Sequence, residues 1–297
     1  MTSRRTAVAG GSIAFAVLGA FFPGLRSSDF EWQEAVPRGY TVEVRGIIGT
    51  IHAEPSSGGQ ARVVGTRIKG EHGEPNGVEI RIMRVSRRII ICTVYPRDRR
   101  WGSLDESDES DESDDVCEAA QRNAPTRGRN DTRIDFRVQV PAGVHFVGQT
   151  VTDDVVLRGL RGNAEGYSVA GDVAISDVRG TAIDAATIGG RIDLLDLDAG
   201  QVYGGTLSGD VHFKGKIHAG GDYSFLSYAG EVIIELPNSA GVSFTVNAPR
   251  DDVRSVVPLS PSPSARRRMF GRQGNGSAEM TVTSLSGGVE IRKADSP

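Results

Sequence analysis

Four aspartates recur in the second half of the chain, where short strands would project them to one side: Asp172, Asp193, Asp196 and Asp210. Carboxylates that project from stacked strands can act as the acid and base of a polysaccharide lyase or hydrolase. However, the strands here are short and few, which leaves little room for a substrate cleft, and a likeness of fold does not make a site. We therefore expect no catalytic residues.

Metal and cofactor motifs are missing from the sequence. The five histidines are scattered along the chain: His52, His72, His145, His212 and His218. The chain has no His-Glu-x-x-His motif and no phosphate-binding glycine loop with lysine, and no Gly-x-Ser-x-Gly elbow follows the N-terminal segment. Gly-Asp-Val steps resemble calcium-binding nonapeptide repeats, but the glycine triplet of those repeats is absent. We expect no metal and no cofactor.

The two cysteines bracket a hydrophilic segment. Cys92 lies in the apolar run 89–94, and Cys117 directly follows the acidic run 105–115. In an exported protein such a pair is expected to form a disulfide that closes the base of the insertion. The alternative is two buried free thiols.

Charge is distributed in blocks rather than over one face. The net charge is −4, which does not indicate the basic surface that nucleic-acid binding requires. An acidic insertion, 103–116, and a Pro-, Ser- and Arg-rich insertion, 248–277, are expected to be solvated and mobile. Weak calcium binding by the first and binding of an anionic polymer by the second remain alternatives.

A seven-residue pattern returns through the second half: apolar, any, Gly, any, apolar, any, apolar. Its copies begin at Val169, Ile188, Leu207 and Tyr228, so the spacing is 19, 19 and 21 residues. Looser copies begin at Val151, where Asp153 takes the glycine position, and at Ile47 and Leu285. In each copy, apolar residues take every second position near the end of the pattern, as they do in a half-buried strand.

A repeat of this length holds about two short strands and their turns, too little for a unit with a crossover helix. It predicts an all-β, right-handed β-solenoid-like stack in which Val173, Ile192 and Val211 face inward as neighbours. The alternative is an antiparallel β-sandwich or meander. Residues 40–141 form a strand-rich lead-in, with strands expected at 41–45 and 133–140 among others.

The residue after each glycine position forms a second series: Asp154, Asp172, Arg191, Asp210 and Glu231. Stacked on the outer face, neighbouring carboxylates would repel one another, and Arg191 would relieve that repulsion. We expect this ladder to keep the outer face solvated and to fix the register between the coils.

The N-terminus has the features of a targeting segment. Arg4 and Arg5 precede an uncharged, mostly apolar run from Ala7 to Leu25. This pattern predicts a signal peptide or N-terminal membrane anchor over 1–28, with membrane association through the segment if it is retained.

The lead-in strand at 133–140, the following Pro141-Ala142-Gly143 and the Gly-Asp-Val repeats resemble a bacterial β-strand-repeat family of unknown function. Its members are often labelled as adhesins, or as similar to the head domain of autotransporter adhesins. The resemblance covers 40–292 and implies one β-repeat domain in a cell-envelope setting. It supplies no catalytic residues.

Two functional classes follow from these observations. The favoured one is a non-enzymatic, exported envelope or surface protein that binds an unidentified polymer or protein in the periplasm, on the outer membrane or outside the cell. The alternative is a carbohydrate-active parallel β-helix enzyme, which an exposed aromatic row facing a groove would favour. Only Tyr203, Tyr223, Phe225 and Tyr228 cluster in the sequence, so the first class is expected.

Overall fold

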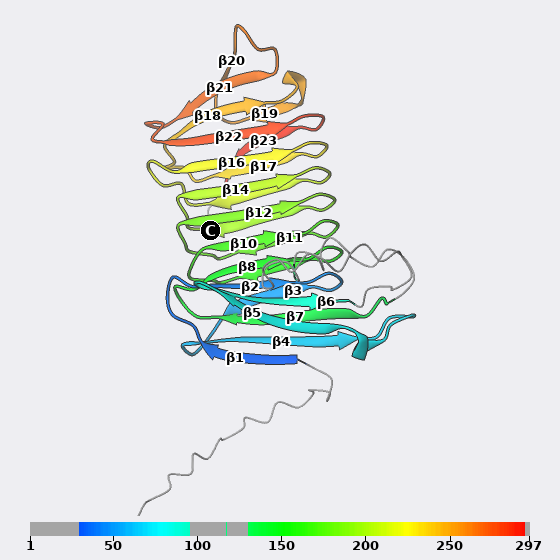
Figure 1. Cartoon of the computed structure of the whole chain (residues 1–297). Helices are drawn as coiled ribbons and strands as arrows, with labels where there is room; N and C mark the ends of the chain where they lie inside the picture. Colours follow the sequence, from blue (N-terminus) through cyan, green and yellow to red (C-terminus); the bar gives the residue numbers. More distant parts are fainter. Residues whose placement is uncertain (1–29, 96–116, 118–129, 295–297) are drawn as a thin grey trace, which may run out of the picture.

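The computed structural model describes residues 30–95, 117 and 130–294. The expected targeting segment 1–28 and the acidic insertion 103–116 lie outside the described residues. Two β-sheets run the length of an elongated stack (Figure 1), with one main hydrophobic core between them. The all-β, solenoid-like architecture predicted from the repeats is confirmed.

Neighbouring strands within each sheet are seldom consecutive in the chain. In spatial order, sheet I contains β1 (Phe30–Ala35), β4 (Gln60–Ile68), β7 (Arg133–Val140), β3 (Ile51–Pro55), β9 (Val155–Arg158), β11 (Val173–Ser176), β13 (Ile192–Leu197), β15 (Val211–Gly215), β17 (Val232–Leu236), β23 (Val289–Lys293) and β19 (Val253–Ser255). Sheet II contains β20 (Leu259–Pro261), β21 (Arg268–Gln273), β18 (Val242–Asn247), β22 (Ala278–Ser284), β16 (Asp222–Ser227), β14 (Gln201–Thr206), β12 (Ala182–Thr187), β10 (Ala164–Tyr167), β8 (His145–Gln149), β2 (Thr41–Arg45), β6 (Arg88–Val94) and β5 (Glu79–Val85). Two short 3₁₀ turns, η1 (Pro75–Gly77) and η2 (Arg250–Asp252), lie in connections.

One strand from each sheet forms a coil, and successive coils pair in parallel. Val173 pairs with Ile192 and Ile192 pairs with Val211, and all three side chains are fully buried. The predicted rungs of valine and isoleucine are therefore confirmed. Because the central pairs are parallel, the antiparallel sandwich or meander is wrong.

Chain order and spatial order differ at both ends of the stack. The coil β2–β3 lies between the coils β6–β7 and β8–β9. The final coil, β22–β23, lies between β16–β17 and β18–β19. In each case a coil formed early or late in the described chain occupies an interior layer, and antiparallel strands cover the outside (Figure 1).

The Pro-, Ser- and Arg-rich insertion differs from its expected mobile state. Residues 248–277 contain β19, β20 and β21, of which β21 pairs antiparallel with β18. Val257 and Met269 are buried in the core, so this segment contributes apolar anchors despite its polar composition. The lead-in strands at 41–45 and 133–140 form as predicted, and β1, which no sequence pattern predicted, pairs with β4.

Buried hydroxyl groups join the coils at the corner where sheet II passes into sheet I. The Thr187 hydroxyl donates to the Gly171 carbonyl (2.8 Å) and the Thr206 hydroxyl to the Gly190 carbonyl (3.0 Å). The same position in other coils is occupied by Thr150, Ser168, Ser227 and Ser284, each of which donates to a carbonyl at this corner. These bonds satisfy carbonyls that the turns leave outside the strand ladders.

The corner glycines are required by close approach between coils. A Cβ atom on Gly190 would overlap the carbonyl of Gly171 in the preceding coil. A glycine therefore recurs once per coil, because the backbones of neighbouring coils lie too close at this corner for a side chain to fit between them.

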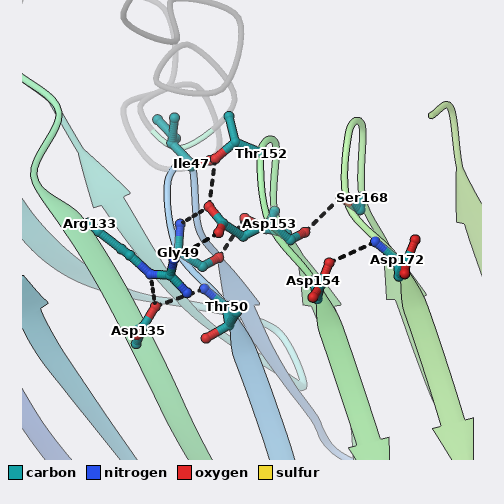
Figure 2. Close-up of polar contacts among 11 residues, drawn as sticks. Ile47, Gly49, Thr50, Arg133, Asp135, Thr152, Asp153, Asp154, Ser168 and Asp172 are labelled. Atoms are coloured by element: carbon teal, nitrogen blue, oxygen red, sulfur yellow. Dashed lines mark hydrogen bonds and ion pairs between the residues drawn. The ribbon is translucent and has the colours of Figure 1, made fainter. Parts of the chain in front are cut away.

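Asp153, which takes the glycine position of its coil, joins three coils at the N-terminal junction (Figure 2). Its Oδ2 accepts from the Gly49 amide (2.9 Å) and the Thr152 hydroxyl (2.8 Å), and its Oδ1 lies 3.1 Å from Arg133 Nη1. Arg133 also bonds Asp135 at 2.6 Å. The exception in the repeat thus lies where β9 meets the inserted coil β2–β3.

Candidate binding site on the outer face of sheet II

The four aspartates considered for chemistry do not come together. Asp172 and Asp210 lie at the corner before sheet I. Asp193 and Asp196 lie in β13, and the pairing of β13 with β15 shifts register at Asp196. Asp196 is exposed, has a φ of 55° and pairs with Lys214 at 3.3 Å. The structure therefore forms no acid–base pair from this set.

The corner aspartates instead bind the backbone of the next coil. Asp154 Oδ1 accepts from the Asp172 amide (2.8 Å), and Asp172 Oδ1 accepts from the Arg191 amide (2.8 Å), as Figure 2 shows for the first pair. Asp210 Oδ1 likewise accepts from the Glu231 amide (2.9 Å). These ladder residues therefore contact one another through hydrogen bonds from amide to carboxylate, which join each coil to the next.

The clustered aromatic residues divide between core and surface. Tyr223 and Phe225 are buried, and both pack against Phe213 with ring centroids 5.9 and 4.6 Å away. Tyr203 and Tyr228 are exposed. Only the last two are therefore available to a ligand.

An open hollow of about 330 Å³ lies on the outer face of β10, β12, β14 and β16. Glu165, Asp184, Tyr203 and Ser224 form one row across it, because they pair in register from strand to strand. The remaining lining residues are Ala182, Ile183, Gln201, Val202 and Asp222. The lining contains three carboxyl groups, one amide and one aromatic ring, and no lysine or arginine.

Tyr203 forms the aromatic part of this hollow. It is 38% exposed, and the hydroxyl end of its ring lies over Gly205, where a Cβ atom would overlap it. The missing side chain at Gly205 thus lets the ring lie along the sheet. An aromatic ring held in this way offers a face to a ligand at little cost in conformational entropy.

The carboxyl groups of Glu165 and Asp184 lie on neighbouring strands. Tyr167 donates to Glu165 Oε2 at 3.1 Å, and Asp184 Oδ1 is buried without a hydrogen-bond partner among the described residues. Burial, together with the charge of Glu165, raises the pKa of Asp184 to about 6 against the opposing effect of Tyr167. Burial and the charges of Asp184 and Glu165 also raise the pKa of Tyr167.

A row of apolar side chains is exposed at the sheet II to sheet I corner: Val169, Ile188, Leu207, Tyr228 and Leu285. These residues open the seven-residue copies, and the alternation of the pattern suggests an inward position for them. They point outward because the buried corner position belongs to the preceding hydroxyl residue, such as Thr206 before Leu207.

The structure joins Cys92 and Cys117 by a disulfide, with Cα atoms 5.9 Å apart. Both residues are buried and form a small cluster with Ile90, against which Met83 and Val94 pack. This cluster lies on the outer face of sheet II, near the N-terminal end of the stack.

The histidines stay apart, and His212 lies on the outer face of sheet I, 3.1 Å from Glu235. Within 30–95, 117 and 130–294, no three His, Cys, Asp or Glu residues group as a metal site. Burial opposes ionisation of Glu235, but bonds from Arg292 and His212 prevail and lower its pKa. This arrangement is a structural ion pair.

The hollow was missed because its residues lie outside the seven-residue window. Glu165, Asp184, Tyr203 and Ser224 follow the same spacing of 19, 19 and 21 residues as the glycines. Their strands are short and rich in Gly and Ala, so they gave no strong pattern of their own. Aligning the whole repeat would have brought these four residues into one column.

Comparisons with known proteins agree with the architecture. Residues 148–292 match the family model described as Toastrack DUF4097, a family of unknown function, and this part of the chain belongs to that family. The predicted membership in a β-strand-repeat family is thus confirmed. No match was found among curated proteins.

Two solved structures match this chain over most of its length. One is a putative cell adhesion protein from Clostridium sporogenes, with 10% identity, a TM-score of 0.38 and coverage of 90% of this chain and 100% of that one. The other is a putative adhesin from Bacteroides fragilis, with 13% identity, a TM-score of 0.36 and coverage of 91% and 98%. Among the residues that the structure describes, no helix has the length and apolar character needed to cross a membrane.

Proposed function

We propose that this chain is a non-enzymatic, exported protein of the cell envelope or cell surface that binds a polymer or another protein through its stacked strands. The N-terminal pattern of Arg4, Arg5 and the apolar run 7–25 supports export. The pairing of Cys92 with Cys117 supports an oxidising compartment, because disulfides rarely persist in the cytosol.

The observation that carries the binding role is the hollow on sheet II. Tyr203 is an exposed aromatic residue on the outer face of β14, outside the core between the sheets. Polar groups that can form hydrogen bonds line the hollow around it, and such groups can orient a ligand.

Fractionation combined with pull-down tests this proposal. The native chain carrying a C-terminal tag is expected in the envelope or medium, and the purified protein is expected to retain envelope material. Tyr203→Ala should lose that retention while Tyr223→Phe, a buried change, keeps it. A cytoplasmic location together with no retained material would refute the proposal.

A second candidate is a carbohydrate-active enzyme, and the pair Glu165–Asp184 favours it. Neighbouring strands lie about 4.8 Å apart, close to the carboxyl spacing of about 5–5.5 Å in retaining glycosidases. A carboxyl group with a pKa of about 6 suits a general acid. The open face argues against catalysis, since it does not exclude water from the reacting groups.

Turnover separates the two candidates. The binding proposal expects retention of polysaccharide by the wild type, and no release of reducing ends by either the wild type or Asp184→Asn. Release of products that depends on Asp184 would establish the enzyme instead.

A further inference from the structure

The hollow on sheet II has a distinctive balance of charge. Glu165, Asp184 and Asp222 line it, and none of them has a lysine or arginine partner within the lining. Their negative charges lie within a few strand spacings of one another, where they repel. Burial raises the pKa of Asp184, and the charge of the neighbouring Glu165 raises it further. A ligand that brings positive charge would relieve the repulsion, and an anionic ligand would increase it.

The hollow also contains groups that recognise more than charge. The ring of Tyr203, supported over Gly205, presents a flat apolar face of the size of a sugar ring. Gln201 and Ser224 both donate and accept hydrogen bonds, which suits hydroxyl groups. A small metal ion would not use the aromatic ring.

The strand order gives the site a direction. Glu165 in β10 and Tyr203 in β14 are separated by β12, which carries Asp184 in the same row. At about 4.8 Å per strand, Glu165 and Tyr203 are about 10 Å apart along the stack. A polymer that runs along the stack can therefore place one ring on Tyr203 and a neighbouring group beside Asp184 and Glu165.

We infer that the hollow binds an amino sugar polymer that runs along the stack, with a sugar ring on Tyr203 and a free ammonium group against Glu165 and Asp184. The inference rests on the proposed binding function and names its ligand class. Ionised carboxylates and an ammonium group form charge-assisted hydrogen bonds, which are stronger than neutral ones. The aromatic ring of Tyr203 adds contacts with the CH groups of the sugar ring and cation–π contacts with an ammonium group.

Isothermal titration with three matched oligosaccharide series tests the inference: chitosan oligosaccharides with free amino groups, chitin oligosaccharides with acetylated ones, and cello-oligosaccharides with hydroxyls. The chitosan series is expected to bind about tenfold more tightly than the other two at low salt. Glu165→Gln or Asp184→Asn should remove that preference, and Tyr203→Ala should weaken all binding about fivefold or more while Tyr203→Phe retains it.

Asp196→Asn serves as the matched control. Asp196 is an exposed carboxylate of the same coil that lies away from the hollow, and asparagine tolerates its φ of 55°. This variant should bind as the wild type does. At neutral pH, melting temperatures of the variants no more than a few degrees below that of the wild type would show that losses of binding are local.

Several results would overturn the inference without touching the proposed function. Equal binding of chitosan and cello-oligosaccharides would assign a neutral saccharide site. Polylysine that competes fully with chitosan, with Tyr203→Ala unaffected, would assign a basic protein partner. Retention of envelope material with no oligosaccharide bound would place the ligand elsewhere. A cytoplasmic protein that retains nothing would refute the proposed function as well.

Discussion

The hydroxyl of Thr206 donates a 3.0 Å hydrogen bond to the carbonyl of Gly190, which belongs to the corner of the preceding coil. The side chain is buried, so water cannot replace the bond. Thr206→Val keeps the shape but leaves the carbonyl unsatisfied, and it is expected to lower the free energy of unfolding by about 1–3 kcal/mol. Urea denaturation measures this loss. Thr206→Ser should lose much less, because serine performs the same role at position 227.

Gly190 itself tolerates no side chain. In Gly190→Ala the new methyl group would overlap the Gly171 carbonyl, so we expect a loss of about 1–3 kcal/mol or more. Gly200→Ala is the control, since nothing lies within 4 Å of a Cβ atom there. Similar melting temperatures of the two variants would contradict close packing at the corner.

The disulfide between Cys92 and Cys117 spans 25 residues. A closed loop of this length contributes roughly 3 kcal/mol in the chain-entropy model. Cys117→Ser is therefore expected to lower the melting temperature by about 4 °C or more. Adding reductant to the wild type should reproduce the shift and leave the variant unchanged. Two reactive thiols in denatured, unreduced protein from the envelope would rule out the bond.

The raised pKa of Asp184 gives a stability effect of definite sign. Its value of about 6 exceeds the ordinary 3.8, so the folded state favours the protonated form relative to the unfolded state. Stability from this group is present below about pH 4 and is lost as the pH rises through about 6. Glu165 and Tyr167 of β10 act on the carboxyl group, Tyr203 of β14 pairs with Asp184 on the other side, and Asp222 of β16 lines the same hollow.

Asp184→Asn removes the ionisation. We expect the melting temperature of the variant to rise relative to that of the wild type as the pH increases from about 4 to about 6, and the difference to be constant below and above this range. Melts across this range measure the difference. A variant whose difference from the wild type does not change with pH would show that Asp184 titrates normally.

The repeat period predicted the central coils well, because each central strand pairs with the strand that is one repeat away in the sequence. Val173, Ile192 and Val211 are each one coil apart, so spacing and alternation together specify their contacts. The same pattern could not predict the inserted coils. The alternation in β2 or β22 indicates an inward face, but every layer offers a similar apolar neighbour, so the pattern does not choose between them.

The candidate site was less accessible to sequence reasoning. The four aromatic residues 203, 223, 225 and 228 look alike in a linear cluster, yet the strand pleat sends Tyr223 and Phe225 inward. Asp184 and Glu165 become neighbours only when the sheet II strands are aligned, and nothing in their own segments marks them as charged partners. The raised pKa of Asp184 depends on burial that only the folded stack creates.

The insertion of β22–β23 between two earlier coils has a consequence for the time course of folding. During synthesis or export from the N-terminus, β18 and β19 are available before β22 and β23 exist. Until the last residues arrive, β16–β17 either has an open edge or pairs with a temporary neighbour that must later separate. Completion of these layers therefore waits for β22 and β23, and a chain shortened before residue 278 would keep an unpaired strand edge where the complete stack has a paired layer.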